Sequence, residues 1–353
     1  MSERKNISVL LTDTHLFERG TKKDAIIETN YEEVYKSFKK SIKVAKENNL
    51  PHVIHAGDFF DSRKHQSQNL LMLAYDILEL FRESGIILIL VTGNHDKTDY
   101  RSDFSFLSVF KDHPNLTLIE RTHHFDDDEN KVRFHFISYF DNDLYLEVLN
   151  EQLMKLHKNY KNVLVTHIGV SGVIANSGEK TEASIKISHF KDFDKVLIGH
   201  YHNYSSHSKD RIVYFGSALQ HNFGEDNNKG VVLLNDKLNL QRVRTEFKEY
   251  RNIEVDVSEI TQSELDELAK DDTNEYKRLI LTGDINLIKA LDRTKLIESG
   301  VKVDVKAEVI EVQKIEQKIE SHSLDSIQEE FKVFCDNNSY DKEEGLSHLL
   351  KII

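Results

Sequence analysis

The chain has 353 residues, of which 39% are apolar and 30% charged, and its formal net charge is −13 at pH 7. This length exceeds what one minimal core needs, so we expect a large domain with smaller appendages. The acidic balance excludes a protein that coats nucleic acid through a globally basic surface, although bound divalent cations would supply local positive charge. The single cysteine, Cys335, excludes an internal disulfide and a thiolate cluster for zinc. Any metal would therefore be held by His, Asp and Asn, a ligand set that suits manganese, magnesium, iron or zinc.

The sequence shows no pattern typical of export or of membrane insertion. No apolar run approaches the roughly 20 residues that a membrane span needs, and the start of the chain, MSERKNISVLL, lacks the apolar region of a signal peptide. We therefore expect a cytoplasmic protein with no membrane partner. The basic pairs at 22–23 and 63–64, and Lys97 with Arg101, could guide a phosphate backbone or could be solvated surface.

The first half of the chain alternates short apolar runs with amphipathic stretches, which is typical of strands laid against helices in an α/β layered fold. Val34, Phe38 and Ile42 recur every four positions and so share one face of a predicted helix. The run 68–83 has the same character. The predicted strands are 7–12, 52–57, 86–93, 115–120, 132–139, 162–168 and 195–200.

Strand-like runs at 211–217, 229–235 and 238–246 favour a meander that completes a second sheet. Two packed mixed sheets flanked by helices would result, and we expect them to form one domain over residues 1–250.

The remainder of the chain predicts three further segments. A new alternation of strand-like and helix-like runs predicts a small α/β domain over 251–310. The charged stretch 311–320 is typical of a linker. Apolar residues recur at spacings of three and four within 321–353, which predicts amphipathic C-terminal helices.

Polar residues with metal-binding side chains follow five of the predicted strands. The five motifs are Asp13-Thr14-His15, Gly57-Asp58-Phe59-Phe60-Asp61, Gly93-Asn94-His95-Asp96, Thr166-His167 and Gly199-His200-Tyr201-His202. Because open α/β sheets bind ligands at the carboxyl ends of their strands, we expect these side chains to meet. His200 and His202 are two positions apart on an extended segment, so they point to opposite sides and could serve two different metals. Most of the motifs are weak signals alone, but five in this order are not a coincidence.

This ordered set resembles the calcineurin-like metallophosphoesterase superfamily, whose signature is D-x-H, G-D-x-x-D, G-N-H-D/E, a lone His and G-H-x-H. The resemblance implies a four-layer α/β fold with two packed mixed sheets flanked by helices, and a site for two divalent metal ions. By the same resemblance the first metal would take Asp13, His15 and His202, the second Asn94, His167 and His200, and Asp58 would bridge them.

The resemblance also implies roles for three residues that are not ligands. His95 would lie beside the phosphate, where a protonated imidazole could stabilise the transition state or protonate the leaving 3′ oxygen. Asp96 would orient that imidazole or a ligand. Asp61 stands where several cellular nucleases carry a second catalytic histidine and where bacterial and phage relatives carry aspartate. His65 and His221 lie near the motifs and could contact substrate.

Within the superfamily the chain is most similar to the SbcD family of DNA-repair exonucleases, which includes the recombination nuclease of T-even bacteriophages. Three features carry this similarity. They are GDFFDSRK at 57–64, GNHD at 93–96 where phosphoprotein phosphatases usually have GNHE, and the block of 214–217 with 223–226 and 229–230. The small domain and terminal helices occur in the same order as in that family.

The similarity implies a nuclease, acting as an exonuclease or endonuclease, that hydrolyses DNA phosphodiester bonds in recombination and repair. Its cofactors would be two divalent metal ions, with Mn²⁺ as the preferred ion and Mg²⁺ as the alternative. Its partners would be DNA and an SbcC-like ATPase of the SMC family, gripped by residues 321–353, and pairing with a second copy of the chain stays open. A phage-encoded chain would act in the host cytoplasm.

Two other functions remain open at this stage. A phosphatase or phosphodiesterase that acts on a small nucleotide would carry the same metal motifs, but would not need the block after His202 or the regions after Arg251. A catalytically silent scaffold subunit would have lost metal ligands, and none of the seven is missing.

Overall fold

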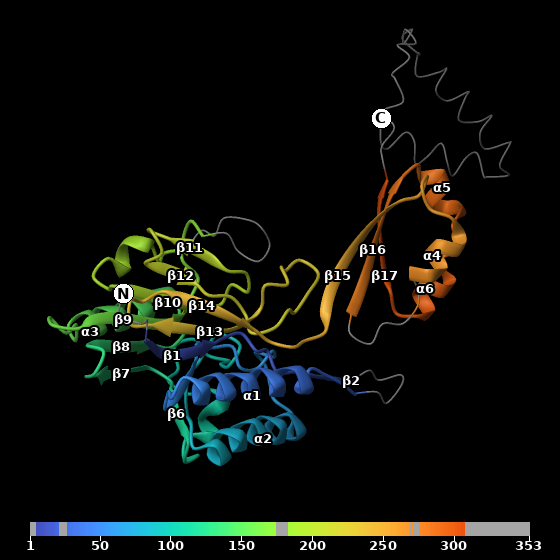
Figure 1. The fold of residues 1–353 in the computed structure, drawn as a ribbon. Coiled ribbons are helices and arrows are strands. Elements are labelled where there is room, and N and C mark those ends of the chain that lie inside the picture. The colour runs from blue at the N-terminus through green and yellow to red at the C-terminus, as the bar shows by residue number, and fades with distance from the viewer. Residues whose placement is uncertain (1–4, 21–26, 174–182, 269, 271–274, 308–353) are drawn as a thin grey trace, which may run out of the picture.

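The computed structural model describes residues 5–20, 27–173, 183–268, 270 and 275–307. Two six-stranded sheets pack face to face with helices on their outer sides, and a three-stranded sheet stands to one side of them (Figure 1). This arrangement confirms the predicted α/β layering of sheets flanked by helices.

The first sheet has a parallel centre extended by an antiparallel hairpin. In spatial order its strands are β14 (Leu240–Arg244), β13 (Gly230–Asn235), β1 (Asn6–Leu11), β4 (His52–His55), β5 (Ile87–Val91) and β6 (Leu116–Ile119). Strands β1, β4, β5 and β6 run parallel, whereas β13 is antiparallel to β1 and to β14. Helices α1 (Tyr31–Glu47) and α2 (Gln68–Ser84) cover its outer face.

The second sheet repeats this plan. In spatial order its strands are β11 (Ser205–His207), β12 (Ile212–Tyr214), β10 (Lys195–Gly199), β9 (Lys161–His167), β8 (Val132–Ile137) and β7 (Thr122–Asp127). Its four central strands are parallel, and β11 and β7 are antiparallel edges. Helix α3 (Asn142–Leu153) and the short 3-10 helix η2 (Ile187–Phe190) cover its outer face.

The central strands of the two large sheets are mostly apolar because both of their faces are buried. In β9, Val163 and Val165 face the first sheet, while Leu164 packs under the outer layer with α3. In β5, Ile89 faces the second sheet and Leu88 packs toward α1 and α2. Side chains alternate between faces along a strand, so an uninterrupted apolar run is what a strand between two layers requires.

The predicted meander after His202 is wrong. Of the three predicted runs, the first forms β12, which joins the second sheet parallel to β10, whereas the other two form β13 and β14, a hairpin that extends the first sheet beside β1. The physical reason is that β13 pairs with the edge of β1 that β4 leaves open. Such a pairing between distant segments leaves no local signal in the sequence.

Two further features differ from the expected elements. Residues 122–127, for which no strand was predicted, form the edge strand β7. The helix-like run 286–299 is two short helices, α5 (Ile285–Ala290) and α6 (Thr294–Glu298). The break occurs because Leu291 is extended, with ψ 132°, and Asp292 accepts a hydrogen bond from the backbone N–H of Thr294.

The third sheet is a small parallel unit built from β15 (Glu249–Asp256), β16 (Glu275–Gly283) and β17 (Lys302–Ala307). It packs its own apolar cluster against α5, α6 and α4 (Gln262–Leu268). The described chain also contains the short hairpin of β2 (Glu18–Gly20) and β3 (Ile27–Thr29), and the 3-10 helix η1 (Phe106–Phe110).

The segments predicted at 311–320 and 321–353 lie outside the described residues. Within the described ranges, none of the helices has both the length and the apolar content that crossing a membrane requires.

Lys97 lies in the interior and is not part of a basic surface. Its side chain is 1% exposed, and its ammonium donates to the carbonyl oxygens of Ser102, Glu120 and Tyr139 at 3.0 to 3.3 Å. Burial lowers the pKa of Lys97 to about 8. Because Glu120 follows β6 and Tyr139 follows β8, Lys97 links the two large sheets. Of the pair Lys97 and Arg101, which could have guided a phosphate backbone, only Arg101 is exposed to solvent.

Replacing Lys97 with methionine is expected to destabilise the fold. Each buried carbonyl that loses its donor costs about 1 to 3 kcal/mol, so the free energy of unfolding should fall by about 2 kcal/mol or more in urea denaturation at pH 7. Lys64→Met, at an exposed position, is the matched control and should change little. Equal stability of Lys97→Met and the parent chain would show that the link between the sheets is not important for stability.

Candidate metal centre

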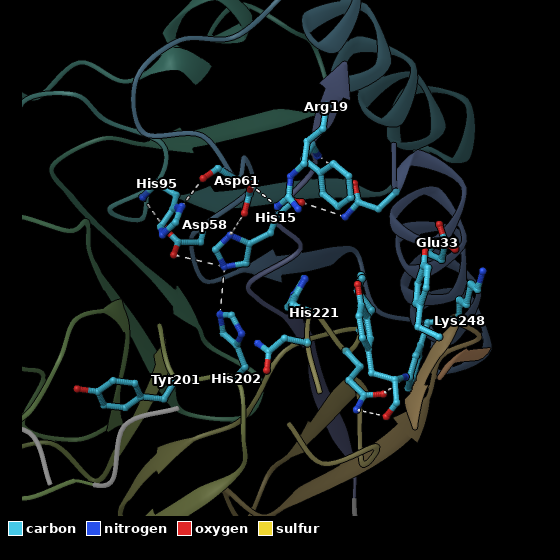
Figure 2. Close-up of a pocket in the computed structure, with 18 of the residues that line it drawn as sticks. His15, Arg19, Glu33, Asp58, Asp61, His95, Tyr201, His202, His221 and Lys248 are labelled. Atoms are coloured by element: carbon cyan, nitrogen blue, oxygen red, sulfur yellow. Dashed lines mark hydrogen bonds and ion pairs between the residues drawn. The ribbon is translucent and has the colours of Figure 1, made fainter. Parts of the chain in front are cut away.

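All five motifs meet where the parallel strands of the two large sheets end. Strands β1, β4 and β5 of the first sheet lead into the Asp13, Asp58 and Asn94 loops, and β9 and β10 of the second sheet lead into His167 and His200. Side chains from both sheets therefore face one another across a single site, part of which is drawn in Figure 2.

One group of donors surrounds His15. Its Nε2 lies 3.8 Å from Asp13 Oδ1 and 3.7 Å from Asp58 Oδ2. Nε2 of His202 lies 3.1 Å from the same nitrogen and 3.8 Å from Asp13 Oδ1. Asp13, His15 and Asp58 are buried, so two imidazole nitrogens and two carboxylates converge on a small space shielded from water.

A second group of donors lies on the other side of Asp58. Nε2 of His167 lies 3.2 Å from Asp58 Oδ2 and 3.1 Å from Asn94 Oδ1, and His200 Nδ1 lies 2.9 Å from the same amide oxygen. His167 Nδ1–H donates to the backbone oxygen of Ala56, which leaves Nε2 as the ligand atom. The seven predicted ligands thus form two groups that share Asp58, as a bridging carboxylate would.

The charge state of these groups fits a cation site. Burial alone would raise the pKa of Asp13, but the hydrogen bond from His15 and the nearby His167 hold it well below its usual value. Burial alone would lower the pKa of His167, but the charge of Asp58 raises it to about 9. The carboxylates therefore require positive charge in this space, and divalent cations would supply it in place of protons on the imidazoles.

Four residues of the site have strained backbones. The φ angles are 51° at Asp13, 44° at His15, 55° at Asp58 and 92° at His200, in the region that residues with a Cβ rarely adopt. Cross-loop hydrogen bonds hold this conformation, among them those from Asp13 N–H to Gly57 O and from His15 N–H to Asp58 O. Strain of this kind persists where the surrounding fold fixes it and is common at functional sites.

Two glycines permit the close approach of the loops. A Cβ at Gly93 would lie 2.2 Å from Asp58 Oδ1, and one at Gly57 would lie 2.4 Å from His167 Nδ1. Any side chain at either position would displace a ligand. The glycines of the G-D and G-N-H-D motifs are therefore required by the packing of the site.

Asp96, which was expected to orient the His95 imidazole or a ligand, holds together the loops that carry Asp58 and Asn94. Its carboxylate accepts hydrogen bonds from the backbone N–H groups of Gly93 at 2.8 Å, Phe60 at 3.0 Å and Phe59 at 3.3 Å. Burial and the charge of Asp58 nevertheless raise the pKa of Asp96 to about 6. Asp96 thus fixes the second motif against the third.

His95 lies at the edge of the candidate metal ligands. Its Nδ1–H donates to the backbone oxygen of Asp61, and Arg63 donates to its Nε2 at 2.7 Å. Burial lowers the pKa of His95. Arg63 thus places a positive charge next to His95 at this edge of the site. The Asp61 carboxylate lies 3.6 Å from His15 Nδ1 and accepts from Arg19 at 3.1 Å.

Of the two histidines left open in the sequence, His221 lies in the site and His65 does not. The His221 ring centroid lies 4.9 Å from that of His15 and 4.8 Å from that of His202, and its Nε2–H donates to the backbone oxygen of Asp13 at 2.7 Å. His65 is exposed and does not line the cavity. The only sequence signal for His221 was its place in the block after the last motif.

Glu225 was not singled out from the sequence, although it lies in the same block. It accepts from His202 Nδ1–H at 2.8 Å and lies 3.1 Å from Lys229 Nζ, and both Glu225 and Lys229 are buried. Burial opposes ionisation, but the hydrogen bond and charge of His202 lower the pKa of Glu225 to about 2. The carboxylate thereby fixes the tautomer of His202 that turns Nε2 toward His15.

The profile of the calcineurin-like phosphoesterase family matches residues 9–204, which is more than half of the chain and includes all five motifs. The chain belongs to this family. The superfamily resemblance is thus confirmed, and the phosphoesterase is a hydrolase whose family commonly uses two divalent metal ions.

Solved structures similar to this phosphoesterase are distant. One is a protein described as a 5′-nucleotidase from Staphylococcus aureus, in complex with alpha-ketoglutarate, with 13% identity and a TM-score of 0.42 over 68% of this chain and 53% of that one. Another is a dimetal phosphatase from Danio rerio, with 9% identity and a TM-score of 0.43 over 68% of this chain and 98% of that one. A calcineurin-like phosphoesterase from Bacillus subtilis has 12% identity and a TM-score of 0.40 over 69% and 90%.

Removing the charge of Glu225 is expected to weaken metal binding. Loss of a carboxylate that orients a ligating imidazole typically lowers metal affinity about 10- to 100-fold, so Glu225→Gln should weaken Mn²⁺ binding in calorimetry by this factor. The matched control is Asp226→Asn, which neutralises the exposed neighbouring carboxylate and should bind Mn²⁺ like the parent. Thermal unfolding in chelator reports on folding separately, and unchanged affinity in a folded Glu225→Gln protein would refute the role of Glu225.

Proposed function

We propose that this phosphoesterase is a metal-dependent DNA nuclease of the SbcD type, cutting phosphodiester bonds as an exonuclease or endonuclease in recombination and repair. The observation that carries the proposal is the cavity of about 470 Å³ in front of the metal ligands. One side is formed by the ligands, and the other by Tyr250 and Tyr276 at the base of the small sheet. A substrate with its phosphate at the ligands would therefore extend onto the small sheet.

The sequence supports DNA over a small phosphomonoester. The GDFFDSRK and GNHD motifs and the block after His202 resemble the corresponding segments of SbcD nucleases. In the structure, residues in and next to this block contact both a candidate metal ligand and the small sheet. Lys229 donates to the backbone oxygen of His202 at 2.6 Å, and Gln220 joins the block to the small sheet by accepting from the backbone N–H of Tyr250 at 2.8 Å. The small sheet is thus connected to a metal ligand through a few residues.

The chemistry begins with a phosphate at the two groups of ligands. Two divalent cations, Mn²⁺ first, held by the seven ligands would clamp the phosphate and lower the pKa of a water between them. The protein's own contribution is to fix those ligands, exclude bulk water and place Arg63 and His95 at one edge of the site.

Arg63 and His95 form a pair that a phosphate would rearrange. In the structure the Arg63 guanidinium donates to Nε2 of His95 and keeps that nitrogen unprotonated. A phosphate oxygen that accepts the hydrogen bonds of the Arg63 guanidinium would leave Nε2 of His95 without this donor. The negative charge of the phosphate would then raise the pKa of the His95 imidazole. His95 then holds a proton beside the leaving 3′ oxygen only when substrate is bound.

An SbcC-like ATPase of the SMC family is the partner in this proposal. Its support is the amphipathic pattern of 321–353 alone, which lies outside the described residues. Such a helix would present anchors at i, i+3, i+4 and i+7 to a groove on the partner.

The direct test compares substrates under identical conditions. Single-stranded linear DNA, a small phosphodiester and a nucleoside monophosphate should be offered with Mn²⁺ and with Mg²⁺, and we expect Mn²⁺-dependent cleavage of the DNA above all. Asp58→Asn, which lacks the shared carboxylate charge, should abolish cleavage and weaken binding of both ions. Hydrolysis of the nucleotide alone would instead identify a small-nucleotide enzyme, and a metal-loaded protein that cleaves none of them would be a scaffold.

His95→Ala should separate chemistry from metal binding. Turnover is expected to fall by about 100-fold, the usual scale for a group that transfers a proton, while Mn²⁺ binding in calorimetry stays near that of the parent. His65→Ala removes an exposed histidine of the neighbouring loop that does not line the cavity, and it should cleave DNA normally. If His95→Ala loses both metals, His95 is a ligand and its proposed role is wrong.

A further inference from the structure

The wall of the cavity beyond the metal ligands consists of aromatic and cationic side chains that the chemistry above does not use. Its members are Phe17, Arg19, Phe247, Lys248, Tyr250 and Tyr276. They come from the segment entering β2, from the turn before β15, and from the first residues of β15 and β16. Figure 2 shows Lys248 and Glu33 on the side of the cavity away from His95, with His15 and His221 between them.

The two tyrosines form a tilted pair of rings that the small sheet holds in place. Tyr250 and Tyr276 are register partners on the parallel strands β15 and β16, and their ring centroids lie 4.7 Å apart at an interplanar angle of 31°. Lys248 Nζ lies 4.0 Å from the centroid of the Tyr276 ring. Both rings are half-buried and line the cavity, so they offer flat apolar surface at a fixed position.

The opposite edge of this wall connects directly to the metal side. The Arg19 guanidinium lies 4.3 Å from the centroid of the Phe17 ring and donates to Asp61 Oδ2 at 3.1 Å. Asp61 in turn lies 3.6 Å from the ligand His15. The metal ligands and the aromatic wall are therefore two ends of one continuous cavity.

The charges on this wall suit a neutral ring better than a second phosphate. Arg19 and Lys248 line the cavity together with Asp61, which accepts from Arg19, and Glu33, so two carboxylates match the two positive charges. Burial raises the pKa of Tyr276, and the nearby charges of Glu33 and Glu28 raise it further. A carboxylate here can accept a hydrogen bond from an exocyclic amino group.

We infer that this aromatic wall binds one unpaired nucleobase of the DNA whose phosphate lies at the metal ligands. The inference rests on the proposed function. Stacking of a base on an aromatic ring is sequence-tolerant because every base has a π face, and it strengthens binding by about 5- to 150-fold. A base inside a duplex has both faces covered, so the wall selects single-stranded or frayed DNA.

The test compares two single-stranded oligonucleotides that differ at one nucleotide. One is intact, and the other carries an abasic residue beside the scissile phosphate. With Mn²⁺ present, the parent enzyme should show a KM at least about 5-fold lower for the intact strand. In Tyr276→Ala this ratio should fall toward one, whereas Tyr276→Phe, which keeps the ring, should retain most of it. Tyr75→Ala is the control, since Tyr75 is 48% exposed on α2 and does not line the cavity.

The ratio distinguishes binding of a base from a structural role. If Tyr276 only supported the fold, its loss would raise KM for both strands alike and leave the ratio intact, and that result would overturn the inference. Cleavage of both strands by the parent with the same KM would also overturn it, while leaving the nuclease in place. Failure of the parent to cleave any DNA would refute the proposed nuclease, and preferential binding of the intact strand by that protein would still support the base site.

Discussion

The structure depends on one buried carboxylate. Asp58 Oδ2 lies 3.7 Å from His15 Nε2 and 3.2 Å from His167 Nε2, so it lies close to one imidazole carried by each large sheet. A carboxylate shielded from water is costly unless positive charge or hydrogen bonds compensate it. Here the compensation comes from imidazoles, and from the N–H of His95, which donates to Oδ1 at 2.8 Å. Two sheets that pack elsewhere through apolar contacts are thus fixed relative to each other at this point by electrostatics.

The same constraint explains the irregular backbone around the site. Ligands from two sheets can reach one carboxylate only if the loops turn sharply, which is why Asp13, His15, Asp58 and His200 have positive φ. The stability of the four-layer core holds these loops in conformations they would not adopt alone. The buried Lys97 stabilises the same region, because its ammonium donates hydrogen bonds to carbonyl oxygens that follow β6 and β8. The packed sheets therefore fix the positions of the site residues. The loops themselves contribute little to the stability of the fold.

The sequence predicted what is local and missed what arises between distant segments. Strands with both faces buried and the polar residues directly after them are encoded within a few positions, so the five motifs could be found in the sequence, and the family resemblance then named seven candidate ligands among them. The hairpin β13–β14 could not be assigned to the first sheet, because its partner β1 lies about 220 residues earlier. Glu225 was missed as a site residue, and His221 was left open, for a similar reason, since each acquires its role only by contacting His202 or Asp13 in space.

The small sheet extends this reasoning from the metal ions to the substrate. Gln220, in the block after the last motif, accepts from the backbone of Tyr250 and donates to the backbone oxygens of Glu225 and Tyr250. Any shift of β15 relative to the large sheets would therefore act on Glu225, and through it on His202. If DNA occupies both the metal ligands and the aromatic wall, its binding stabilises the same arrangement of the small sheet that orients His202. Recognition of an unpaired base and the geometry of the metal centre would then be coupled through one short loop, without a separate regulatory element.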